Sequence, residues 1–111
     1  MVIDQAEAMA SIDDMARRIV KEFNPQKIIL FGSYARGAAS SDSDVDLIVV
    51  MPVAGSRRRQ TTEIDMALSD RWLPLDLIVV TPEEFIACKD VIGHILYPAV
   101  REGKVLYERA A

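Results

Sequence analysis

Apolar and polar positions succeed one another along the chain in patterns that predict helices and strands in turn. Over residues 4–23 apolar side chains recur at spacings of three and four, which predicts an amphipathic helix that Asn24-Pro25 ends. The nearly continuous apolar run of residues 45–51 predicts a strand that is covered on both faces, and the run of residues 75–80 predicts a further strand. The two runs share the letters DLIVV, so the chain presents the same strand twice.

Shorter segments lie between these elements. Residues 27–31 are rich in β-branched side chains and predict a strand that Gly32 breaks. Ser33 can then cap a helix that begins near Tyr34 and that Gly37 ends early. A strand, a tight turn and a short helix therefore precede the first DLIVV segment, and residues 38–43 are expected to form a loop between them.

The second half of the chain continues the alternation. Residues 57–71 predict a helix, and Thr81 is the expected N-cap of the next one. Pro98 indicates a further short helix that ends at Gly103, before a small final strand over residues 104–107. Together these elements predict an α/β fold of the α+β type, in which helices flank a small mixed β-sheet in three layers.

Length, composition and charge narrow the class of protein. With 111 residues, half of them apolar, the chain is expected to form one globular domain over residues 1–111. Its 13 basic and 17 acidic residues give a net charge of −4, which argues against general attraction to nucleic acid. The single Cys88, the lack of a signal peptide and the absence of a membrane-spanning run favour a cytoplasmic location.

Carboxylates interrupt both DLIVV strands where apolar side chains are expected. Asp44 and Asp46 stand two residues apart, so they point to the same face of a strand, and Asp76 occupies the equivalent place in the second strand. If the two strands lie close together, three carboxylates converge at one end of the sheet. Such oxygen ligands suit Mg²⁺ or Mn²⁺. A pair of these ions about 3.5–4 Å apart can activate an attacking hydroxyl and stabilise a leaving phosphate.

A Gly-Ser pair at the preceding turn supplies the other half of a site. Backbone N–H groups at a strand-to-helix turn bind anions, and Gly32 lets a phosphate approach the backbone. The hydroxyl of Ser33 is a further hydrogen-bond donor. In combination with the three carboxylates, this turn predicts a site that binds phosphate groups.

These residues resemble a known family. Gly32-Ser33, ten further residues and then Asp44-Val45-Asp46 resemble the signature of the DNA polymerase beta-type nucleotidyltransferase superfamily. The stretch FGSYARG followed by SDSDVDL is similar to the minimal nucleotidyltransferase (MNT) branch, and the similarity extends over nearly the whole chain. The resemblance implies a polymerase beta-like nucleotidyltransferase fold.

The resemblance also implies roles for individual residues. Gly32 and Ser33 would hold the nucleoside triphosphate, and Arg36, at a commonly basic position, would contact a phosphate. The carboxylates that bind two Mg²⁺ ions, or Mn²⁺, and carry catalysis would be Asp44, Asp46 and Asp76. The last of these is also the candidate that helps to deprotonate the acceptor.

The implied reaction is the transfer of a nucleoside monophosphate, usually AMP from ATP, to an acceptor hydroxyl with loss of pyrophosphate. Because the chain is short, we expect the acceptor site to be supplied either by a shallow surface or by another polypeptide. The resemblance suggests a HEPN toxin that an MNT antitoxin neutralises by adenylylating a tyrosine, by binding, or both. The alternatives are a non-catalytic module that blocks its partner by contact, and transfer to a small molecule or an RNA end. The sequence is also compatible with a homo-oligomer.

Three further features have less specific interpretations. Arg57, Arg58 and Arg59 form a basic run at a helix start, where cations are unfavourable, so they either face solvent or contact a partner or a phosphate. His94 has no other ligand residue at metal-binding spacing, and we expect a packed or surface histidine. Cys88 lacks a catalytic context and is expected to be a small core residue.

Overall fold

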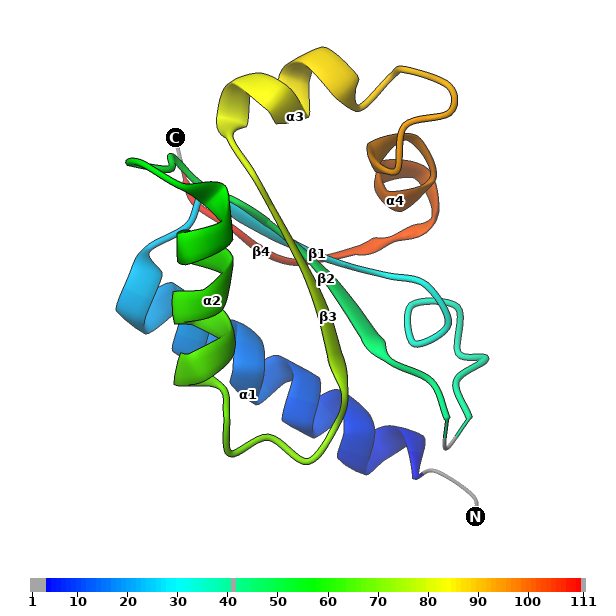
Figure 1. Cartoon of the computed structure of the whole chain (residues 1–111). Helices are drawn as coiled ribbons and strands as arrows, with labels where there is room; N and C mark the ends of the chain where they lie inside the picture. The colour runs from blue at the N-terminus through cyan, green and yellow to red at the C-terminus, as the bar shows by residue number, and fades with distance from the viewer. Residues whose placement is uncertain (1–3, 41, 111) are drawn as a thin grey trace.

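The computed structural model describes residues 4–40 and 42–110, and Figure 1 shows how its helices and strands are arranged. The first half of the chain contains α1 (Gln5–Phe23), β1 (Lys27–Phe31), β2 (Val45–Val50) and α2 (Arg57–Ala67). The second half contains β3 (Leu75–Val80), α3 (Pro82–Cys88), α4 (Leu96–Glu102) and β4 (Lys104–Glu108). None of the helices in these described ranges is long and apolar enough to cross a membrane.

The strands form one mixed sheet in the order β3-β2-β1-β4. β1 pairs in antiparallel fashion with β2 and with β4, whereas β2 and β3 run parallel. The parallel pair is in continuous register, with Asp46 opposite Asp76 and Val50 opposite Val80. A parallel connection needs a crossover, and α2 provides it. The two DLIVV segments therefore lie side by side, residue against residue.

Helices cover both faces of this sheet, which confirms the predicted three layers (Figure 1). Successive strand residues point to opposite faces, so each central strand contributes to two apolar clusters. The cluster beneath α1 and α2 includes Ile12, Met15, Ile19, Ile28, Leu30, Leu47, Val49, Ile64 and Leu68. The cluster beneath α3 and α4 consists of the buried residues Ile29, Ile48, Val50, Val80, Phe85, Leu96 and Ala99.

Local capping explains where the helices begin. The Asp4 side chain accepts hydrogen bonds from the first backbone N–H groups of α1, and Asn24 ends this helix in the left-handed conformation at φ 50°. The Thr81 side chain accepts from the Glu84 N–H while the Glu84 carboxylate accepts from the Thr81 N–H, a complete capping box. The predicted start of α3 is thus confirmed.

The predicted short helix after Ser33 is wrong. Residues 33–37 form consecutive turns, in which the N–H groups of Ala35 and Arg36 both donate to the carbonyl oxygen of Gly32. Gly32 and Gly37 both have positive φ, at 75° and 69°, and the four residues between them are too few to nucleate a regular helix.

The predicted helix over residues 57–71 also ends early, at Ala67. Leu68 leaves the helical conformation at φ −107°, and its N–H lies near the carbonyl oxygens of both Ile64 and Asp65. The Arg71 guanidinium then donates to the carbonyl oxygens of Asp65 and Leu68, which satisfies acceptors at this helix end. The remaining residues before β3 form the short connection to the edge strand.

Candidate active site

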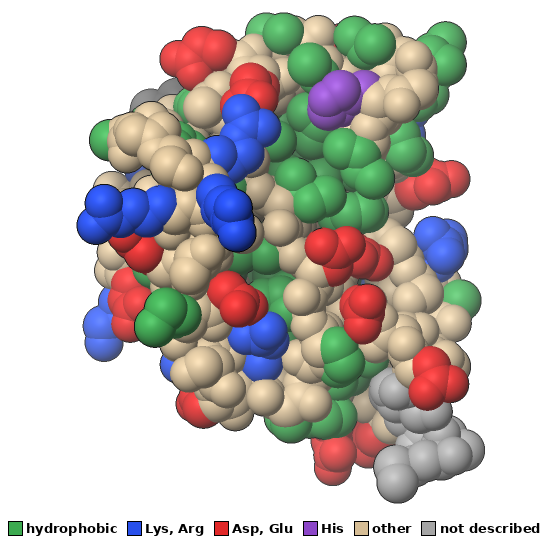
Figure 2. Space-filling view, viewed as in Figure 1, with side chains coloured by type: hydrophobic (Ala, Val, Ile, Leu, Met, Phe, Trp, Pro, Cys, Tyr) green, Lys and Arg blue, Asp and Glu red, His purple; other side chains and the backbone are tan. Residues whose placement is uncertain are grey.

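The candidate carboxylates lie on the face of the sheet that α3 and α4 partly cover. Asp46 shares a strand face with Ile48 and Val50, and Asp76 shares one with Val80, all three of which are buried beneath these helices. The acids therefore continue this face beyond the helical cover, at the start of β2 and β3. Figure 2 shows acidic side chains gathered directly below an apolar surface in the middle of the view.

The strand register brings two of the acids together. Asp46 is directly opposite Asp76 in the parallel pair, where neighbouring strands are about 4.8 Å apart. Asp44 immediately precedes β2, and the adjacent Val45 N–H donates to the carbonyl oxygen of Pro74 at 2.8 Å, which ties the starts of the two strands together. The three acids thus come from adjoining backbone segments.

The electrostatics of the site centre on Asp46. Burial raises the pKa of this carboxyl above its usual range, and the negative charges of Asp76 and Asp44 raise it further. The positive charge of Arg36 acts in the opposite direction and lowers the pKa of Asp46. Negative charge nevertheless dominates around this carboxyl, and a bound cation would neutralise it.

The Gly-Ser turn lies against the same carboxylate. A side chain at Gly32 would overlap the Oδ2 atom of Asp46, and the φ of +75° at this position further favours glycine. Ser33 is half-buried in the turn, whereas Arg36 is exposed and close enough to Asp46 to affect its titration. The structure thus brings Gly32 into contact with Asp46 and places the Arg36 charge nearby.

The donor chemistry of this site fits a divalent cation of the magnesium type. Several carboxylates share one partly buried end of the sheet, and hard oxygen ligands are those that Mg²⁺ prefers. Within residues 4–40 and 42–110, however, no three His, Cys, Asp or Glu side chains are already grouped so that they could hold a metal ion. The backbone positions suit a metal centre, but the side chains do not form a closed ligand cluster in this conformation.

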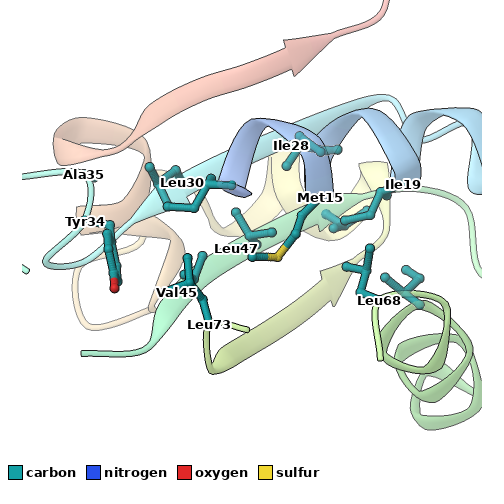
Figure 3. Packing of buried hydrophobic residues seen from close by; sticks show 14 of the residues in the cluster. Met15, Ile19, Ile28, Leu30, Tyr34, Ala35, Val45, Leu47, Leu68 and Leu73 are labelled. Atoms are coloured by element: carbon teal, nitrogen blue, oxygen red, sulfur yellow. The ribbon is translucent and has the colours of Figure 1, made fainter. Parts of the chain in front are cut away.

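Sequence reasoning did not single out Tyr34 as a residue near the site. Its side chain is buried, and burial together with the charge of Asp44 raises the pKa of the Tyr34 hydroxyl. Figure 3 shows the ring beside Val45, with the hydroxyl directed toward the segment that enters β2. An aromatic residue directly after a Gly-Ser turn was the available signal, but its burial depends on packing against distant residues.

The other residues that the sequence analysis discussed lie outside this acidic group. The Arg57 guanidinium pairs with the Glu84 carboxylate at 2.6 Å and joins the start of α2 to the start of α3. Arg59 pairs with Glu63 at 3.5 Å along α2. His94 Nδ1 accepts a hydrogen bond from the Leu96 N–H at 3.1 Å, at the start of α4. Cys88 is half-buried against the cluster beneath α3 and α4.

The arrangement of strands and helices is that of known nucleotidyltransferase structures. A candidate nucleotidyltransferase from Sulfolobus solfataricus matches with a TM-score of 0.65 at 18% identity, over 95% of this chain and 84% of that one. A toxin–antitoxin solved with AMP-PNP matches with a TM-score of 0.56 at 22% identity, over 87% and 73% of the two chains. The toxin–antitoxin MntA-HepT matches with a TM-score of 0.52 at 18% identity, over 91% and 73%. These matches confirm the predicted polymerase beta-like fold.

A family model supports the same class at the level of sequence. The model of the nucleotidyltransferase domain matches residues 13–101, a range that contains every candidate site residue. The chain therefore belongs to the nucleotidyltransferase domain family, and this membership implies that its chemistry is nucleotidyl transfer. The sequence matches none of the curated proteins with which it was compared.

Proposed function

We propose that this protein transfers AMP from ATP to an acceptor hydroxyl, and that Asp44, Asp46 and Asp76 are its metal-binding and catalytic carboxylates. The observation that carries the proposal is the strand register, which sets Asp46 directly opposite Asp76 while Gly32 lies against the same Asp46 carboxylate. The phosphate-binding turn therefore lies directly beside the carboxylates, because Gly32 of the turn is next to Asp46. Family membership supports the reaction type.

The turn after β1 is suited to the triphosphate. The turn is only partly buried, so an anion can approach its peptide groups even though the Asp46 carboxylate takes the side-chain position of Gly32. Ser33 contributes a hydroxyl donor, and the exposed Arg36 guanidinium contributes a positive charge with a forked set of donors that matches phosphate oxygens. This group would orient the α-phosphorus toward the acids on β2 and β3.

The carboxylates would hold two Mg²⁺ ions, or Mn²⁺, which when bound supply Lewis-acid stabilisation to the phosphoryl oxygens. Asp76 lies exposed on the edge strand β3, where an acceptor can approach from outside the sheet. Its carboxylate takes the proton of the attacking hydroxyl. A bond forms between the acceptor oxygen and the α-phosphorus, the bond between the α- and β-phosphates breaks, and pyrophosphate leaves.

For the acceptor we propose a tyrosine of a HEPN-type partner protein, so that the chain acts as an antitoxin. The similar folds of the toxin–antitoxin solved with AMP-PNP and of MntA-HepT support this choice. So do the exposed apolar side chains of the connection between α3 and α4, Val91, Ile92 and Ile95, because uncovered apolar side chains favour contact with another protein.

The same apolar side chains support a second candidate function, a non-catalytic module that neutralises its partner by contact. Ile92 is 82% exposed, and burying this apolar side chain against a partner would be favourable. A binding module, however, needs no group of like charges on a partly buried strand. The carboxylates therefore favour the enzyme.

A transfer assay separates the two functions. ATP labelled at the α-phosphate is incubated with Mg²⁺ and a purified HEPN protein from the same genome, with wild type or the double variant Asp44→Asn/Asp46→Asn. The control is Asp42→Asn, an exposed acid outside the sheet. We expect label on the HEPN protein with wild type and control only. No label transfer by wild type, together with neutralisation by the double variant, would support the binding module instead.

A further inference from the structure

One edge of the sheet lacks the features that usually protect a sheet edge. The two edge strands are β3 and β4 (Figure 1). β4 has a register shift against β1 and a charged residue at each end, Lys104 and Glu108, and both features discourage pairing with another chain. β3 pairs with β2 in continuous register, and Asp76 is its one charged residue. The edge of β3 is therefore the better suited of the two to pair with an added strand.

The hydrogen bonds between β2 and β3 show which backbone groups of β3 point outward. At the start of the parallel pair, the Val45 N–H donates to the carbonyl oxygen of Pro74 at 2.8 Å. Backbone groups alternate in direction along a strand, so Asp76 faces β2, whereas the N–H and C=O groups of Leu75 and Leu77 point away from it. Among the described residues, no other segment forms a hydrogen bond with the backbone of these two leucines. Their outward groups are available to a fifth strand.

Only the acidic end of this edge is accessible. At the other end of β3, Val79 and Val80 are buried, and the ion pair of Arg57 with Glu84 at 2.6 Å joins the start of α2 to the start of α3. Residues 75–78 are half-buried or exposed. An added strand would therefore pair with the half of β3 that carries the candidate catalytic acid.

An apolar groove lies beside the accessible half of β3. It has a volume of about 390 Å³ and is formed by the end of α2 and the connection to β3. Two of its lining residues are large and apolar, Met66 at 68% exposed and Trp72 at 59% exposed, and such side chains are enriched in protein interfaces. Because α2 covers the face opposite to Asp76, successive side chains of an added strand would point alternately toward Asp76 and toward the groove.

We propose that the acceptor protein binds by adding an extended segment to the edge of β3. Its hydroxyl-bearing residue lies opposite Asp76, about 4.8 Å away across the strands, with its side chain on the face of the Asp76 carboxylate. The residues directly before and after it are apolar and enter the groove beside Met66 and Trp72. The backbone pairing thus gives affinity, and the apolar–hydroxyl–apolar alternation gives specificity. The inference rests on the proposed function, since it requires Asp76 to act on the attacking hydroxyl.

The first test measures transfer kinetics with the HEPN protein as acceptor, for wild type, Leu75→Pro and Leu75→Ala. Proline removes the outward N–H at the first residue of an edge strand, a position where proline is tolerated. Alanine also shortens the side chain but keeps the N–H, so it is the matched control. We expect Leu75→Pro to raise the KM for the acceptor about tenfold at nearly unchanged kcat, and Leu75→Ala to keep the wild-type KM.

The second test addresses the groove with exposed side chains, whose replacement leaves the core intact. Trp72→Ser should raise the KM for the acceptor about tenfold. The control is Ile86→Ser, which replaces a similarly exposed residue on α3, at 67%, outside the groove. Mass spectrometry then identifies the labelled residue of the acceptor. Replacing either of its two neighbours by aspartate should raise KM as Trp72→Ser does.

The outcomes separate this inference from the proposed function. If wild type transfers no label, the proposed function is wrong and the inference fails with it. If wild type transfers label but Leu75→Pro has the same KM as Leu75→Ala, or Trp72→Ser the same KM as Ile86→Ser, only the mode of acceptor binding is overturned. Sedimentation of the protein alone tests another occupant. A wild-type dimer that Leu75→Pro dissociates would assign the edge to a second copy of the chain and would also overturn the inference.

Discussion

Replacement of Asp46 by asparagine should stabilise the metal-free protein at neutral pH while it abolishes nucleotidyl transfer. Burial, and after it the charges of Asp76 and Asp44, raise the pKa of Asp46. The folded state therefore favours the neutral side chain over the charged one, and asparagine is neutral and of nearly the same shape. The substitution removes the electrostatic repulsion between Asp46 and the other two carboxylates, which lowers the stability of the folded wild type.

The geometry of the sheet sets the size of this effect. Asp46 and Asp76 are directly opposite each other on adjacent strands, which are about 4.8 Å apart. Two like charges at about this distance repel by about 1–3.5 kcal/mol for effective dielectric constants between roughly 70 and 20. Arg36 offsets part of the repulsion. We therefore expect a gain of about 1 kcal/mol in the free energy of unfolding, equivalent to roughly 4 °C in Tm.

The assay is thermal and urea unfolding of both proteins in EDTA between pH 7 and pH 4. The control is Asp13→Asn, which replaces an exposed acid on α1 and should leave stability unchanged. Because the pKa of Asp46 is raised above its ordinary value of 3.8, the folded wild type takes up its proton before the unfolded chain does. The advantage of Asp46→Asn should therefore be complete at neutral pH and shrink as the pH falls toward that value. An advantage that is absent at pH 7, or that stays constant with pH, would refute the electrostatic reasoning.

Three further substitutions test other parts of the structure by urea unfolding. Gly32→Ala should cost at least about 1–2 kcal/mol and weaken binding of a fluorescent ATP analogue, because its Cβ overlaps Asp46. Gly55→Ala has a similar positive φ in open space, so equal losses in the two variants would show that the overlap is unimportant. Thr81→Ala removes the N-cap of α3 and should cost about 1 kcal/mol without reducing transfer. Leu47→Ala should cost about 2–5 kcal/mol, and a wild-type midpoint would contradict its place in the core.

The elements that the sequence predicted correctly depend on local signals. The capping residues of α3 lie next to one another in the sequence, and continuous apolar runs are typical of strands covered on both faces, as the burial of β2 shows. The turn after Ser33 was mistaken for a helix because positive φ at both Gly32 and Gly37 outweighs the capping signal. Such backbone conformations become apparent only when the strands on either side are placed.

The pairing of Asp46 with Asp76 could not be predicted from the sequence alone. The repeated DLIVV letters suggest that the two strands resemble each other, but register depends on the crossover through α2, and a slip of one residue would have turned every side chain to the other face. The burial of Tyr34 could not be predicted for a related reason. Its burial results from packing against residues of α1 and β2 that are distant in the sequence.

The contact between Gly32 and Asp46 changes the reason for a glycine at this position. Sequence reasoning assigned Gly32 to the approach of a phosphate, yet the space that a side chain would occupy is already taken by the Asp46 carboxylate. Glycine is therefore required before any nucleotide binds. Farther along the same strands, Val49 and Val79 are buried beneath α1 and α2 and Val50 and Val80 beneath α3 and α4. The apolar burial at that end offsets the repulsion at the acidic end, so the sheet can keep several carboxylates together at the site.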